Sequence, residues 1–217
     1  MSRTITIKGI GTAKAKVDYI VISMTLESLH KNYDKAMDLA SDKIRELNES
    51  LMSIGYLKQN LKTINFNIDA EYGQIKDYYG SYKNIFSGYK IVHNLKLEFD
   101  FDTDKLSKTL SVIARCLSHP ELNITFTIKD TSKINEELLK SATINAKRKA
   151  EILCEASNVI LGDLISIDYN WGELDIYSNT HFTCKENIMT MMESRSIDFM
   201  PDDIKLEDTA TFIWEIK

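Results

Sequence analysis

The residue types that most often carry chemistry are few and scattered along this chain. The four histidines, His30, His93, His119 and His181, have neither the HxH nor the HxxxH spacing that places two imidazoles side by side. A metal site or a histidine-centred triad would therefore depend on tertiary contacts, and no G-x-S-x-G motif supplies a nucleophile. We expect no catalytic residues, no metal ligands and no cofactor.

The cysteines predict free thiols. Cys116, Cys154 and Cys184 are odd in number, lie far apart and form no CxxC pair, which argues against a disulfide framework or a zinc site. The first eight residues lack the apolar stretch of a signal peptide and alternate like a strand. No apolar run approaches the roughly 20 residues of a membrane helix. These features predict a cytoplasmic protein without membrane insertion.

Gly9-Ile10-Gly11 is the one glycine pair that could approach a phosphate. A dinucleotide fingerprint needs a third glycine and a helix whose N-terminus meets the pyrophosphate. Here no third glycine follows at the required place, and residues 12–28 alternate like a strand. We interpret the pair as a turn between strands at 3–8 and 12–28.

The charges are unevenly distributed around a net charge of −5, which provides no global basic field for nucleic acid. Residues 129–149 hold six basic and three acidic side chains, and residues 193–217 hold seven acidic and three basic ones. The basic stretch fits a solvated helix face or a complementary contact between subunits. Nucleic acid is not expected as a partner, because no aromatic residues are interleaved with the lysines.

Two segments have the composition of contact surfaces. The stretch from Tyr72 to Tyr89 holds five of the ten tyrosines, and tyrosine is favoured at interfaces. Residues 172–200 form a long connection with clustered methionines, which suit adaptable contacts in a binding loop or lid. Packing of a hairpin tip and a flexible loop are the alternatives. The candidate interface residues are Tyr78, Tyr79, Tyr82, Met189, Met191 and Met192.

Hydrophobic periodicity supplies the elements that would position these residues. Period-two alternation predicts strands at 3–8, 12–28, 61–72, 89–101, 122–128, 161–171 and 209–216, and helical spacing predicts helices at 33–54, 103–117 and 133–158. This order predicts a single α+β domain over residues 1–217, with a largely antiparallel sheet and helices on one face, and it is compatible with two related halves. One core facing a single sheet would hold Ile44, Leu47, Leu51, Leu110, Ile113, Ala146, Ala150 and Leu153.

Three sets of positions carry a resemblance to a known family. They are Ile5-x-Ile7-x-Gly9-x-Gly11 with Asp18, Gly88-Tyr89 with Leu95, and Ala142-x3-Ala146-x2-Lys149-Ala150 before Leu161-Gly162-Asp163. Their order and spacing together resemble the SIMPL-domain family, whose members mostly lack an assigned biochemical activity and include bacterial periplasmic and outer-membrane-associated antigens. The chain departs from the family pattern at Val17-Asp18, where relatives usually have Pro-Asp. The resemblance covers about residues 3–217 and implies an α+β fold, large homo-oligomers in some members and phenotypes tied to stress or signalling. It implies no catalytic residue.

These observations predict a non-enzymatic protein that acts by self-assembly or by binding another protein. The alternative is an enzyme or a small-molecule binder that uses a cleft beside the 172–200 segment. A deep pocket with convergent polar groups would favour the alternative, and a flat aromatic surface would favour assembly.

Overall fold

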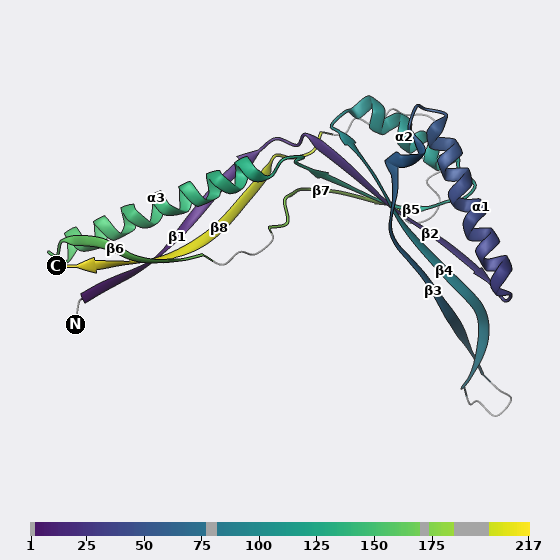
Figure 1. Ribbon diagram of the computed structural model, residues 1–217, viewed down its shortest axis with the longest axis horizontal. Coiled ribbons are helices and arrows are strands. Elements are labelled where there is room, and N and C mark those ends of the chain that lie inside the picture. The colour runs from purple at the N-terminus through teal and green to yellow at the C-terminus, as the bar shows by residue number, and fades with distance from the viewer. Residues whose placement is uncertain (1–2, 77–81, 170–173, 185–199) are drawn as a thin grey trace. The chain divides into compact units, whose positions relative to one another are not determined.

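A computed structural model describes residues 3–76, 82–169, 174–184 and 200–217 of the chain (Figure 1). The pairings of β1 with β8, β2 with β4, β3 with β4 and β6 with β8 are all antiparallel. This arrangement confirms the predicted α+β class. The elements are β1 (Arg3–Ala15), β2 (Tyr19–His30), α1 (Tyr33–Met52), a 3-10 turn (Lys58–Asn60), β3 (Leu61–Lys76), β4 (Tyr82–Asp100), α2 (Thr103–Arg115), β5 (Glu121–Thr127), α3 (Ser132–Ala156), β6 (Leu161–Asp168), β7 (Tyr177–Cys184) and β8 (Ile204–Ile216).

The chain divides into two compact units. Unit 1 comprises Met1–Asp18, Thr127–Asn179 and Pro201–Lys217, and unit 2 comprises Tyr19–Phe126 and Thr180–Met200. The described strands form a three-stranded sheet in the order β1-β8-β6 and a five-stranded sheet in the order β3-β4-β2-β5-β7. The expectation of one core on a single sheet is therefore wrong. One domain over residues 1–217 stays a prediction.

Unit 1 is a three-stranded sheet with α3 packed on it. β1 and β8 pair along their whole length without a register shift, and their alternate side chains face the helix. Small residues on α3 let the helix approach the sheet closely, because the buried positions recur at every fourth residue and half of them are alanine. The helix residues buried in this way are Ile134, Leu138, Ala142, Ala146, Ala150 and Cys154.

Gly9 and Gly11 lie inside β1, so the predicted turn at this point is wrong. A Cβ atom on Gly9 would lie 2.2 Å from the carbonyl oxygen of Ala142, and one on Gly11 would lie 2.1 Å from that of Leu138. Any side chain here would overlap the backbone of α3. The glycines are needed for close packing of helix on strand, and the break between β1 and β2 comes after Ala15 instead.

Unit 2 has α1 and α2 on the five-stranded sheet. α1 buries Ala36 and Ala40 against Ile91 of β4, and the Tyr56 hydroxyl lies 2.9 Å from the Thr109 hydroxyl of α2 in a buried contact. Strand β7 was not predicted, because the 172–200 segment has no clear period in its sequence. Its presence corrects the expectation that this whole segment is a connection.

The predicted core residues are distributed over both units. Leu47, Leu51, Leu110 and Ile113 are buried in unit 2, and Ala146 and Ala150 are buried in unit 1. Ile44 is only half-buried, and Leu153 is 48% exposed, so its assignment to the core was wrong. None of the helices in the described ranges is long and apolar enough to cross a membrane.

Candidate functional site

Side chains of α3 cover the outer edge of β1 in unit 1. The backbone N–H of Ile10 donates to Oδ1 of Asn145 at 3.0 Å, and that of Thr12 donates to Oγ of Ser141 at 3.1 Å. Nζ of Lys149 donates to the carbonyl oxygen of Lys8 at 3.1 Å. Three outward-facing positions of an edge strand are therefore satisfied by side chains of one helix.

The spacing of these partners follows from the geometry of the two elements. Ser141, Asn145 and Lys149 are four residues apart, which corresponds to a helix rise of about 6 Å per step. Their partners on β1 are two residues apart, which corresponds to roughly 6.6 Å along a strand. The two rises nearly match, so the helix can follow the strand for two steps and make three contacts with it. Covering an edge in this way prevents another strand from adding to it.

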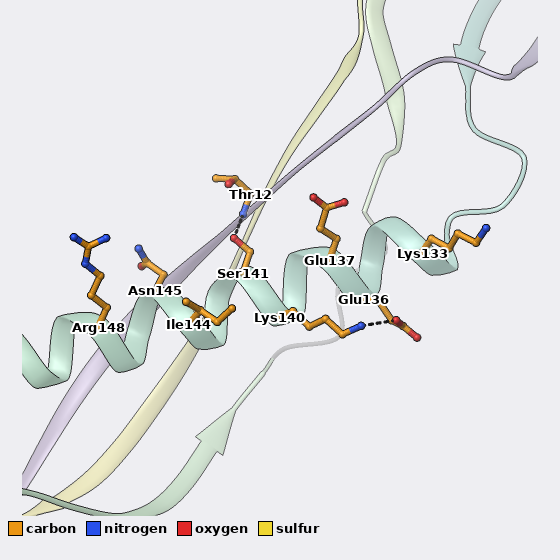
Figure 2. Close-up of a pocket in the computed structure, with 9 residues that line it drawn as sticks. All are labelled: Thr12, Lys133, Glu136, Glu137, Lys140, Ser141, Ile144, Asn145 and Arg148. Atoms are coloured by element: carbon orange, nitrogen blue, oxygen red, sulfur yellow. Dashed lines mark hydrogen bonds and ion pairs between the residues drawn. The ribbon is translucent and has the colours of Figure 1, made fainter.

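An open groove of about 610 Å³ lies along the same helix (Figure 2). Figure 2 shows the Ser141–Thr12 bond and the Lys140–Glu136 pair on opposite sides of α3 in this view. Nζ of Lys140 lies 2.9 Å from Oε2 of Glu136, and this contact holds the pKa of the Glu136 carboxyl below its usual value. The groove is lined by Thr12, Lys133, Glu136, Glu137, Lys140, Ser141, Ile144, Asn145 and Arg148.

The groove lining offers charge of both signs, with three basic and two acidic side chains. It contains neither histidine nor cysteine, and the Ser141 hydroxyl oxygen accepts from the Thr12 amide. Ile144 is 69% exposed among these charges. Such a lining suits a polar protein surface. The groove contains no residue of the 172–200 segment, so the cleft expected beside that segment stays a prediction.

The acidic C-terminal stretch is largely an internal element. Its residues 204–216 form β8, the strand between β1 and β6, and Oδ2 of Asp208 accepts from the Tyr169 hydroxyl at 2.7 Å. That hydrogen bond raises the pKa of Tyr169. A complementary contact between the basic helix and this stretch in another subunit stays a prediction.

His93 occupies the core of unit 2. Its side chain lies at 9% exposure, with Nε2 2.8 Å from Oγ1 of Thr63 and the ring edge against Phe66 at 5.1 Å between centroids. Nδ1 is buried without a hydrogen-bond partner, and burial lowers the pKa of the ring. Among the described residues, no group of three or more histidine, cysteine or carboxylate side chains could hold a metal ion. We interpret His93 as a neutral core residue.

The hairpin of β3 and β4 carries a connected series of aromatic rings. The rings of Tyr33 and Tyr89, of Tyr89 and Phe86, and of Phe86 and Tyr72 are edge-on at 5.5, 5.2 and 5.7 Å. β2 pairs with β4 only from Tyr89 to Asp100, so the hairpin beyond Tyr89 consists of two strands. Tyr33 on α1 thus links the aromatic series of this two-stranded part to a helix.

The predicted interface residues fall partly on this hairpin. Tyr82 is 67% exposed at the start of β4, and Nζ of Lys76 lies 5.9 Å from the centre of its ring. Ile64 and Phe66 of β3 were not predicted as surface residues, because alternation shows which side chains share a face but not whether that face is covered. Tyr78, Tyr79, Met189, Met191 and Met192 lie outside the described residues.

Comparison with known proteins gives one match that covers almost the whole chain. The model of a family described as "SIMPL: Protein of unknown function (DUF541)" matches residues 5–214. No curated protein matches the chain. The match includes residues of both units, the α3 groove and the β3–β4 hairpin.

Proposed function

We propose that this chain, which belongs to the SIMPL family of unknown function, acts without catalysis by associating with copies of itself or with another protein. One observation carries the proposal: large apolar side chains lie exposed along the β3–β4 hairpin, with Tyr72 and Tyr82 on one face and Ile75 and Ile85 on the other. Each is between 40% and 67% exposed. They are Ile64, Phe66, Tyr72, Ile75, Tyr82 and Ile85.

So many exposed apolar side chains on one hairpin favour association with a partner over a surface that faces only solvent. Single exposed apolar residues are ordinary, but several large ones within one hairpin leave much apolar surface in water, and large exposed apolar surfaces mark contact sites. Burying apolar surface stabilises a complex by about 25 cal/mol per Å², before the costs of association are subtracted. The aromatic contacts that link Tyr72 to Tyr33 hold part of this surface in place before a partner binds, which reduces the ordering cost.

Light scattering of the purified chain tests this proposal. We expect a mass that is a multiple of the 24.9 kDa chain, and a lower mass for a Tyr72→Ser, Tyr82→Ser variant. Leu117→Ser is the matched control, because Leu117 is 74% exposed but lies after α2, away from the hairpin. A monomer at every concentration would reject self-association. An assembly unaffected by the double substitution would reject the Tyr72 and Tyr82 part of the hairpin as its contact.

A cytoplasmic location is part of the same proposal, and it is supported by the thiols. Cys116 and Cys154 are free and buried, as expected for a protein that stays in a reducing compartment. Thiol titration of the chain taken from its native cell, unfolded without reductant, should find three reactive groups. Fewer than three, with a disulfide identified by mass spectrometry, would contradict this location.

A further inference from the structure

The two described sheets differ in whether side chains of a helix cover an edge strand. In unit 1 the outer edge of β1 is covered by Ser141, Asn145 and Lys149 of α3. In unit 2, β3 lies at the end of the five-stranded order and pairs only with β4 among the described strands (Figure 1). All but three of its side chains are exposed. An edge of this kind is a template for another strand.

Part of β3 is regular enough to receive such a strand. Its pairing with β4 shifts register between Thr63 and Asn65 and again between Glu71 and Tyr72, and it is regular between these shifts. The regular run, residues 65–71, has Ile68 at its centre. Its side chains alternate strictly, with Phe66, Ile68 and Ala70 on one face and polar residues on the other.

We propose that a second copy of the chain pairs its own β3 antiparallel with this edge, symmetrically about Ile68. The proposal rests on the proposed function and names the partner and the contact. A twofold axis perpendicular to the sheet keeps equivalent side chains on the same face only if it passes through a residue position, not between two. The possible centres of symmetry are therefore single residues.

The charges of β3 select among these centres. Centring the pair on Asp69 or Glu71 would place that carboxylate opposite its own copy, and centring it on Ala70 would place Asp69 opposite Glu71. Like charges directly opposite each other destabilise a strand pair. Centres nearer the start of β3 than Ile68 would leave part of the regular run unpaired.

Centring on Ile68 gives complementary neighbours on both faces. On the polar face Asn67 lies opposite Asp69 and Asn65 opposite Glu71, so amide donors meet carboxylate acceptors. On the apolar face Ile68 meets its own copy and Phe66 meets Ala70. The whole run from 65 to 71 is then paired without opposed like charges.

The edge of β6 is less suited to the same contact. β6 also lies at the end of its sheet, and Leu164, Ile165 and Ile167 are about half exposed. Its pairing with β8 shifts register on both sides of Leu164, which leaves only Ser166 to Asp168 in a regular run. Irregular edges of this kind are a common protection against strand addition.

Thiol cross-linking tests the register directly. Two copies of Ile68→Cys would lie side by side, whereas two copies of Gln74→Cys, also on β3, would lie about 40 Å apart at 3.3 Å per residue. With a short bifunctional thiol reagent we expect covalent dimers of Ile68→Cys well above the level of the unsubstituted protein, and none above that level for Gln74→Cys. Equal cross-linking of the two variants would overturn the register.

Introducing a charge at Asn67 gives an independent readout that does not depend on cysteine reactivity. Asn67→Asp places a carboxylate opposite Asp69 of the second copy and should raise the dissociation constant roughly 2- to 30-fold, counting both symmetric contacts. Asn67→Lys should lower it. Asn84→Asp, on an exposed position of β4, is the control and should change nothing.

The outcomes separate this inference from the function on which it rests. An oligomer by light scattering that neither cross-links through residue 68 nor responds to charge at residue 67 would overturn β3 pairing and leave self-association standing. A monomer at every concentration would overturn both.

Discussion

At the scale of single residues, His93 shows how a group with catalytic potential becomes structural. The ring is enclosed by the sheet, Thr63 and Phe66, and its Nδ1 lacks a partner. A charged imidazolium in this position would lose its hydration without gaining an opposite charge, so burial lowers the pKa below its ordinary value of 6.5. The folded protein therefore favours the neutral ring.

This shift predicts how stability depends on pH. The unfolded chain binds a proton at His93 more readily than the folded chain, so the contribution of this residue is complete above pH 6.5 and decreases as the pH falls toward the lowered pKa. Urea unfolding at several pH values should show a steeper decrease below pH 6.5 for the natural protein than for His93→Leu, by at most about 1.4 kcal/mol per pH unit. Parallel curves for the two proteins would contradict this account.

Gly9 and Gly11 have an equally local role with a larger structural effect. We expect Gly9→Ala to lower the free energy of unfolding by about 1–3 kcal/mol, because the new methyl group would push α3 away from β1. Gly73→Ala is the control, since its Cβ atom would meet only the side-chain oxygen of Ser87 at 3.0 Å. Urea denaturation followed by circular dichroism measures both. A Gly9→Ala variant as stable as the natural protein would contradict the close packing.

At the scale of elements, α3 both packs on its sheet and covers the edge of β1. Removing one of the covering side chains should leave a β1 amide without its hydrogen-bond partner and so destabilise the protein. Asn145→Ala should destabilise the protein by about 0.5–1.5 kcal/mol more than Asn135→Ala on the same helix, because only Asn145 accepts from a β1 amide. The two substitutions share the same change in helix propensity. Equal losses in denaturant titration would show that the edge does not need this cover.

The sequence predicted most elements, and its errors have identifiable causes. Long periodic segments gave the three helices to within a few residues, as with Tyr33–Met52 against the expected 33–54. The glycines of β1 were mistaken for a turn because their packing partner, α3, lies more than 125 residues away along the chain. β7 has no strong local pattern, and its place in a sheet depends on tertiary pairing.

The candidate surface was only partly predictable for the same reason. Composition indicated the tyrosines around Tyr82, and alternation indicated the two faces of β3. Neither could show that β3 would be an edge strand, since that depends on which strands pair and in what order. The covering of β1 by Ser141 and Asn145 could likewise not be predicted from the sequence, because polar residues on a helix ordinarily face solvent.

At the scale of the whole molecule, the chain consists of two compact units, each with its own sheet, and one family model spans both. We propose that association occurs through the hairpin of unit 2, whereas side chains of α3 cover the β1 edge of unit 1. Hydrogen exchange measured over a range of protein concentrations tests this most directly. Those amides of residues 65–71 in β3 that do not bond to β4 should lose protection on dilution, while the amides of residues 8–12 in β1 should exchange at an unchanged rate. Exchange of residues 65–71 that does not vary with concentration would contradict association through this edge.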